Sequence, residues 1–130
     1  MSASFEVVST SAAPAAVGPY SQAVATGELV FASGQISLDP ASGELRGKTA
    51  AEQARQVMIN LKAVLEAAES SLTSVLKTTI FLTDMTAFQE VNEVYSQALG
   101  EHRPARSTVG VASLPKGALV EIEAVALRAR

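Results

Sequence analysis

The pattern of apolar and polar positions predicts two amphipathic helices separated by a strand. Thr49 begins the first helix, because its hydroxyl can cap the first turn and Glu52 completes a capping box. Apolar residues then recur at helical spacing, namely Ala50, Ala54, Val57, Met58, Leu61, Leu65 and Ala68. Thr86 and Gln89 repeat the capping pattern ahead of a second helix, which Gly100 ends. The predicted buried stripe of that helix consists of Phe88, Val91, Tyr95, Ala98 and Leu99.

Segments rich in β-branched and apolar residues predict strands before, between and after the helices. Residues 21–25 and 29–33 flank a turn centred on Gly27 and predict a hairpin. Further strands are expected at residues 5–8, 75–82, 106–111 and 119–127, with 75–82 inside the sheet. This order predicts a single α+β domain over residues 1–130, with both helices on one face of a mixed sheet. The other face then needs a cover that this chain has no helix left to supply.

Composition supports an assembly of several subunits. Apolar residues make up 48% of the chain and charged residues 18%, below the roughly 25% of an average soluble domain. Such a shortage of charge suggests that part of the surface is hidden, so we expect a homo-oligomer. The chain has no secretory leader pattern and no apolar run of about 18 residues, so we expect a cytoplasmic protein with no membrane partner.

Charge and residue usage exclude several classes of function. The net charge is −3 with no basic run, which argues against binding through phosphate neutralisation and so against a nucleic-acid partner. There is no cysteine, and the only histidine is His102, so a thiol nucleophile and a histidine-based metal site are not expected. No phosphate-binding glycine loop or nucleophile elbow occurs either. Any catalysis is therefore expected to be acid–base or electrostatic chemistry without a cofactor or metal.

Arg106 and Glu121 each place a charge in a segment that otherwise predicts a buried strand. Arg106 lies in a Pro-Ala-Arg-Ser sequence and Glu121, fifteen residues on, in Val-Glu-Ile-Glu. A buried guanidinium costs several kcal/mol unless a partner or an anionic ligand satisfies it. We therefore interpret Arg106 as a receptor for a carboxylate or phosphate, and Glu121 as a group that moves protons nearby. A structural ion pair between the two is an equally open interpretation.

Strand alternation predicts which way these side chains point. Arg106 and Thr108 should face a cleft or an interface, while the two valines of the same segment face the core. In the last strand, Glu121 shares a face with Glu123, which we interpret as a solvated residue at a sheet edge.

Three further residues are weaker candidates. Tyr20 follows a rigid Gly-Pro bend and can close the wall of a small pocket, although a core tyrosine is the more common case. Gly34 ends a strand where backbone can approach a ligand, although most such glycines only serve a turn. Asn92 lies beside the buried stripe of the second helix, which alone indicates nothing. His102 and Arg103 are expected to be solvated in a short loop.

Taken together, the motifs of this chain resemble those of the RidA (YjgF) family. The matching segments are Gly18-Pro19-Tyr20-Ser21-Gln22-Ala23, Ser33-Gly34-Gln35-Ile36, residues 77–84, Val91-Asn92-Glu93-Val94-Tyr95, Pro104-Ala105-Arg106-Ser107, Leu114-Pro115-Lys116 and Val120-Glu121-Ile122-Glu123-Ala124. The resemblance implies a chorismate-mutase-like α+β fold and a homotrimer with three ligand clefts at its subunit interfaces. It also implies hydrolysis of reactive 2-imino acids, derived from 2-aminoacrylate and 2-aminocrotonate, to 2-keto acids and ammonia.

The resemblance also implies a role for each candidate residue. Arg106 would bind the substrate carboxylate through a two-point contact, which a lysine could not reproduce. Glu121 would orient or activate the attacking water, or pass protons to the leaving ammonia. The other expected site residues, which would position the imine and the water, are Tyr20, Asn92, Gly34 and Thr108.

Two departures from the family pattern bear on specificity. Thr108 stands where members with this activity often carry a cysteine, which the mechanism above does not need as a nucleophile. The loop at residues 100–104 is shorter than usual and lacks the aromatic residue that commonly precedes Pro-Ala-Arg, so pocket shape and substrate range are expected to differ.

Two other functions compete with the enzyme. One is a non-catalytic trimeric module that binds 2-keto acids or similar small carboxylates, since it would need the same receptor. The other is an endoribonuclease or translation inhibitor, against which the acidic pI and the lack of interleaved basic and aromatic residues count.

Overall fold

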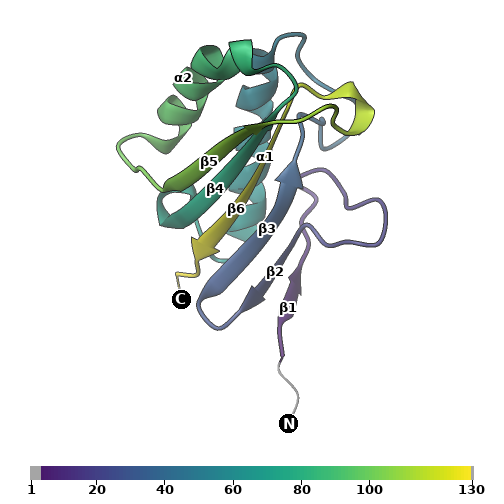
Figure 1. Cartoon of the computed structure of the whole chain (residues 1–130). Coiled ribbons are helices and arrows are strands. Elements are labelled where there is room, and N and C mark those ends of the chain that lie inside the picture. Colours follow the sequence, from purple (N-terminus) through teal and green to yellow (C-terminus); the bar gives the residue numbers. More distant parts are fainter. Residues whose placement is uncertain (1–3, 130) are drawn as a thin grey trace.

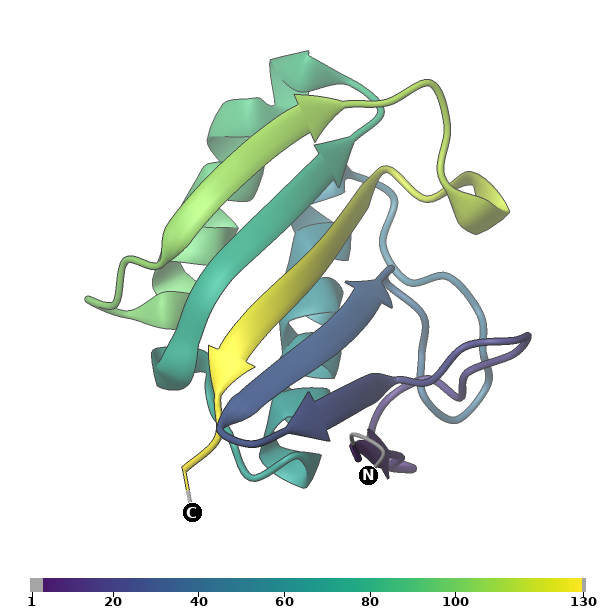
Figure 2. The same ribbon diagram turned by 60° about the horizontal axis from the view of Figure 1, so that its bottom comes forward.

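One mixed sheet of six strands carries both helices on the same face, as Figures 1 and 2 show. The computed structural model describes residues 4–129. In chain order the elements are β1 (Glu6–Val8), β2 (Ala23–Thr26), β3 (Leu29–Gln35), α1 (Ala50–Ala67), β4 (Val75–Leu82), α2 (Phe88–Leu99), β5 (Ala105–Gly110) and β6 (Val120–Leu127). The sheet order is β1-β2-β3-β6-β4-β5. Only the β4–β5 pair is parallel among these neighbours. The predicted α+β architecture is confirmed, and β4 lies inside the sheet as expected.

Helix α1 forms where the capping box predicted it. The Glu52 amide donates to Thr49 Oγ1 at 3.1 Å, and the Thr49 amide donates to Glu52 Oε1 at 3.1 Å. The whole predicted apolar stripe is buried. The same helix also buries Asn60, whose side-chain amide donates to the carbonyls of Ile36 at 3.2 Å and Leu38 at 2.9 Å. Helix α1 therefore secures the loop that follows β3, because those carbonyls have no strand partner to satisfy them.

Helix α2 begins differently from the prediction. The expected capping box at residues 86–89 is absent: the helix is preceded by Ala87, which makes no side-chain cap. Asp84 Oδ1 instead accepts from the Thr86 amide at 2.9 Å, closing a 3₁₀ turn ahead of the helix. Asp84 Oδ1 also accepts from the Thr86 hydroxyl at 2.7 Å, so this carboxylate takes the amide that the Gln89 side chain would accept from in a capping box. The buried stripe includes Val94, whereas Ala98 is exposed at the rim of the groove between the two helices.

The sheet face turned away from the helices is uncovered and carries exposed apolar side chains beside polar ones. Phe31 of β3 is 42% exposed and Val109 of β5 is 40% exposed, and both side chains point to this open face. The prediction that the valines of residues 106–111 enter the core is therefore wrong for Val109. The reason is that α2 covers the opposite side of β5, so Arg106 and Thr108 face the helix layer. No helix in residues 4–129 has the length and apolar character needed to cross a membrane.

Candidate functional site

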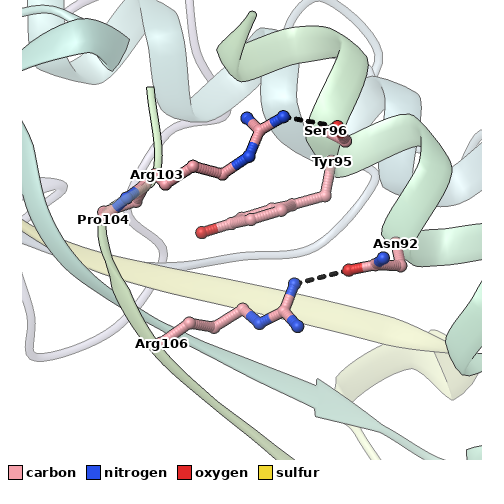
Figure 3. A pocket seen from close by; sticks show the side chains of 6 residues that line it. All are labelled: Asn92, Tyr95, Ser96, Arg103, Pro104 and Arg106. Atoms are coloured by element: carbon pink, nitrogen blue, oxygen red, sulfur yellow. Dashed lines mark hydrogen bonds between the residues drawn. The ribbon is translucent and has the colours of Figure 1, made fainter. Parts of the chain in front are cut away.

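Arg106 is held in a defined orientation by side chains of α2 (Figure 3). Its Nη1 donates to Asn92 Oδ1 at 2.6 Å. Its guanidinium carbon lies 5.5 Å from the centre of the Phe88 ring and 5.2 Å from that of Tyr95, within the range of cation–π attraction. The Tyr95 hydroxyl is fixed in turn by a 2.6 Å hydrogen bond with Thr78 Oγ1. The guanidinium is thus positioned before any ligand arrives.

Arg106 opens into a pocket of about 400 Å³, which we call the Arg106 pocket. The residues that line it are Asn92, Tyr95, Ser96, Arg103, Pro104 and Arg106. Arg106 itself is exposed in the single chain, and β5 is not the buried strand that the sequence pattern predicted. The reason is that β5 is an edge strand, which leaves this position open to solvent on one side.

The loop at residues 100–104 folds back on the end of α2 instead of extending into solvent. Arg103 Nη1 donates to the carbonyls of Gly100 at 2.7 Å and His102 at 2.9 Å, and Nη2 reaches Ser96 Oγ at 3.4 Å. The His102 ring Nε2 lies 2.7 Å from the Val75 carbonyl oxygen. Arg103 is exposed as expected, whereas His102 is half-buried, so the interpretation of His102 as a solvated loop residue is wrong. Arg103 ties the loop to the C-cap residue Gly100 at the end of α2, and His102 ties it to the Val75 carbonyl of β4.

Glu121 lies in a second pocket of about 620 Å³, which we call the Glu121 pocket, together with Tyr20 and Gly34. A Cβ atom on Gly34 would stand only 2.5 Å from Glu121 Oε2, so this glycine leaves space for the carboxylate. Burial raises the pKa of the Glu121 carboxyl above its usual range, and the charge of Glu123 raises it further. Glu123 is exposed as expected, but β6 is an inner strand, so the prediction of an edge position is wrong. Tyr20 is 53% exposed, which excludes the core-tyrosine interpretation.

The predicted site residues fall into two groups on opposite faces of the sheet. Arg106, Asn92 and Thr108 lie on the helix side, and Thr108 Oγ1 is shielded from solvent with no hydrogen-bond partner among the described residues. Glu121 projects from the open face of β6. The two pockets share no lining residue. Across residues 4–129 no ion pair joins Arg106 to Glu121, so the structural-pair interpretation is wrong within one chain.

Sequence reasoning missed two contributors to the Arg106 pocket. Tyr95 was expected only as a core residue, yet its ring packs against the guanidinium of Arg106. Arg103 was expected in solvent, yet it lines the same pocket. The sequence did contain a signal for Arg103. It directly precedes Pro-Ala-Arg, the position at which related chains commonly carry an aromatic residue that lines the cleft.

Comparison with known proteins places the chain in a family. Residues 10–128 match the family model described as Endoribonuclease L-PSP. Human 2-iminobutanoate/2-iminopropanoate deaminase is 48% identical over 122 residues, which cover 94% of this chain and 89% of the human protein. The crystal structure of RidA from the Antarctic bacterium Psychrobacter sp. PAMC 21119 superposes with a TM-score of 0.91 at 48% identity, covering 94% of this chain and 98% of that one. That of Escherichia coli TdcF with bound serine gives a TM-score of 0.90 at 44% identity, covering 95% and 99%. The chain belongs to the RidA (YjgF) family, in which relatives are named as imine deaminases and the family model carries an endoribonuclease description.

Proposed function

We propose that this protein hydrolyses 2-imino acids to 2-keto acids and ammonia, without a cofactor. The observation that carries the proposal is the preoriented guanidinium of Arg106, which faces an open pocket and, among residues 4–129, has a neutral amide as its one hydrogen-bond partner. Such a group is a receptor for a small carboxylate. The mammalian relatives named as 2-iminobutanoate/2-iminopropanoate deaminases support this reaction, and the bound serine of TdcF supports an amino-acid-sized ligand.

Arg106 binds the substrate carboxylate through two parallel N–H contacts. The guanidinium has five N–H donors, of which Asn92 takes one, so enough remain for a two-point contact. The rings of Phe88 and Tyr95 limit rotation of the guanidinium, which fixes the direction of the bound carboxylate. The imine carbon next to the carboxylate is held in place as a result, and positioning of this kind lowers the barrier to attack by water.

Glu121 moves protons during the hydrolysis. Its carboxylate takes a proton from the water as the water oxygen bonds to the imine carbon, and the C–N π electrons pass to nitrogen. Glu121 returns that proton to the nitrogen, which gives a carbinolamine with a hydroxyl and an amino group on the same carbon. Glu121 then takes the hydroxyl proton and passes it to the amino nitrogen. The C–N bond breaks as the C=O bond forms, ammonia leaves, and the carbon keeps the water oxygen as its keto oxygen. The raised pKa of this carboxyl suits both transfers near neutral pH. Tyr20, at the same pocket, orients the imine and the water.

The complete site forms between subunits of a homotrimer of the chorismate-mutase-like type. Arg106 and Glu121 point to opposite faces of the sheet, so one small substrate touches both only if they come from neighbouring chains. The uncovered apolar side chains of Phe31 and Val109 support a subunit contact at the open face.

Hydrolysis is tested by generating 2-iminopropionate or 2-iminobutyrate in situ with an amino-acid oxidase, while semicarbazide traps free imine. The wild-type protein is expected to divert the imine to keto acid, Arg106→Ala is expected to abolish the diversion, and Glu121→Gln is expected to reduce it to a small residual rate. If folded wild-type protein binds 2-keto acids but diverts no imine, the non-catalytic binding module replaces the enzyme.

Subunit complementation tests where the site is formed. Arg106→Ala is expected to be inactive and Glu121→Gln to keep only a small residual rate. Trimers mixed at random from the two should regain about a quarter of the intact sites, because some neighbours pair an intact arginine with an intact glutamate. As a control, the double variant mixed with Arg106→Ala contains no intact arginine and should regain nothing. Mixed trimers without recovered activity would contradict a site shared between subunits.

A further inference from the structure

We infer that the Arg106 pocket selects 2-imino acids that carry a second carboxylate, and that Arg103 binds this second group. The inference rests on the proposed function, because it names the substrate class of the same site. The six lining residues include two guanidinium groups and no carboxylate. Figure 3 shows Arg103 and Arg106 reaching toward α2 with the Tyr95 ring between them.

Both positive charges are uncompensated. Arg106 bonds to the amide oxygen of Asn92, and Arg103 bonds to two backbone carbonyls and the Ser96 hydroxyl, all of which are neutral acceptors. Within residues 4–129, no carboxylate lies within ion-pair distance of either guanidinium. A pocket with two such cations attracts a dianion more strongly than a monoanion.

Arg103 keeps donors for a ligand after its contacts within the chain are counted. A guanidinium has five N–H groups, and Arg103 uses two on Nη1 and one on Nη2, which leaves Nε–H and one Nη2–H. Two N–H groups are what a carboxylate takes in a two-point contact. Holding the loop at residues 100–104 against the end of α2 accounts for the three contacts that Arg103 makes, but not for the donors left over or for its place in the pocket.

The two arginines then divide the ligand between them. Arg106 binds the carboxylate next to the imine, as proposed above, and Arg103 binds the carboxylate at the other end. The ring of Tyr95, which lines the pocket between them, offers apolar surface to the connecting carbon chain. The hydrolysis itself is unchanged, since water still adds at the imine carbon and ammonia still leaves. The substrates expected are imines of acidic amino acids, such as 2-iminosuccinate and 2-iminoglutarate.

The test compares imines that have one carboxylate with imines that have two. Amino-acid oxidases generate 2-iminobutyrate and 2-iminoglutarate in the presence of semicarbazide, and kcat/KM is measured for each. Wild-type protein is expected to favour 2-iminoglutarate, and Arg103→Gln is expected to lower that preference about tenfold or more, the effect of losing a charge-assisted contact. As a matched control, Arg55→Gln removes the same charge from α1 outside this pocket and should leave the preference unchanged.

A binding measurement separates the inference from the proposed function. Calorimetry with 2-oxoglutarate and 2-oxobutyrate compares wild type, Arg103→Gln and Arg103→Lys, with thermal melts to confirm that each variant is folded. The role of Arg103 is supported if its replacement weakens the binding of 2-oxoglutarate but not that of 2-oxobutyrate, with a larger effect in Arg103→Gln than in Arg103→Lys. Equal weakening of both ligands, or no preference in the wild type, overturns it and leaves Arg103 as a helix cap. Failure of wild-type protein to hydrolyse either imine would instead refute the proposed function.

Discussion

Replacing Gly34 with alanine tests the role of Glu121 without changing Glu121 itself. A Cβ on residue 34 would lie 2.5 Å from Glu121 Oε2, 2.7 Å from its Cδ and 3.0 Å from its Cγ. Non-bonded heavy atoms make ordinary van der Waals contact at about 3.5 Å or more. Gly34 does not have the positive φ that disfavours alanine, so the substitution acts through this contact and not through backbone strain.

The size of the effect follows from that geometry. The Glu121 carboxylate must move by about 1 Å to restore normal contact distances. A displacement of about 1 Å in a reacting group lowers the rate by roughly 100-fold. The loss of unfolding free energy should be small, about 1 kcal/mol, because the crowded atoms belong to the end of a flexible side chain. Activity and stability should therefore respond very differently to Gly34→Ala.

The assay is imine diversion with semicarbazide as the competing trap, carried out on Gly34→Ala, Glu121→Gln and the double variant. If the alanine acts by displacing Glu121, the double variant should be no slower than Glu121→Gln alone. Gly110→Ala is a steric control, since its Cβ would meet Met85 Cγ at 3.1 Å and not Glu121. The reasoning fails if folded Gly34→Ala keeps its kcat/KM, or if its loss multiplies with that of Glu121→Gln.

Three further outcomes are expected. Arg106→Lys should lower kcat/KM about 100-fold in the same assay, because an ammonium cannot make the two-point contact; near-normal activity would contradict a bound carboxylate. The raised pKa of Glu121 means that kcat/KM should fall, on acidification, at a higher pH than for an ordinary glutamate, and Glu123→Gln should move this fall to lower pH by removing one cause of the shift. An acid limb unmoved by Glu123→Gln would exclude that coupling. Tyr95→Phe leaves the buried Thr78 hydroxyl without its partner, so denaturant titration should show about 1–2 kcal/mol less unfolding free energy, and unchanged stability would count against this bond.

The sequence predicted helix starts and buried stripes correctly where residues close together in the chain decide the local structure. The Thr49–Glu52 capping box and the apolar stripe of α1 formed as expected, because a helix start depends on groups within one turn. The predicted start of α2 was wrong because Asp84, two residues before Thr86, accepts from the Thr86 amide that the capping box would have used. The spacing of the residues alone did not indicate whether Asp84 or Gln89 would accept from this amide.

Residues whose role depends on packing were harder to predict. The alternation of Arg106 and Thr108 against Val109 is correct, but the assignment of the valine to the core is wrong. The alternation along a strand indicates which side chains share a face, but it does not indicate which face of the sheet the helices cover. The same limit hid Arg103, whose place beside Arg106 depends on a loop that folds back onto α2.

The sequence by itself determined the element order, the uncovered sheet face and the residue types able to bind and hydrolyse an imino acid. Only the tertiary structure decided that Arg106 and Glu121 lie on opposite faces, in pockets with no residue in common. The physical reason is that alternation along a strand groups side chains by face, whereas the face that is covered depends on how α1 and α2 pack against the whole sheet.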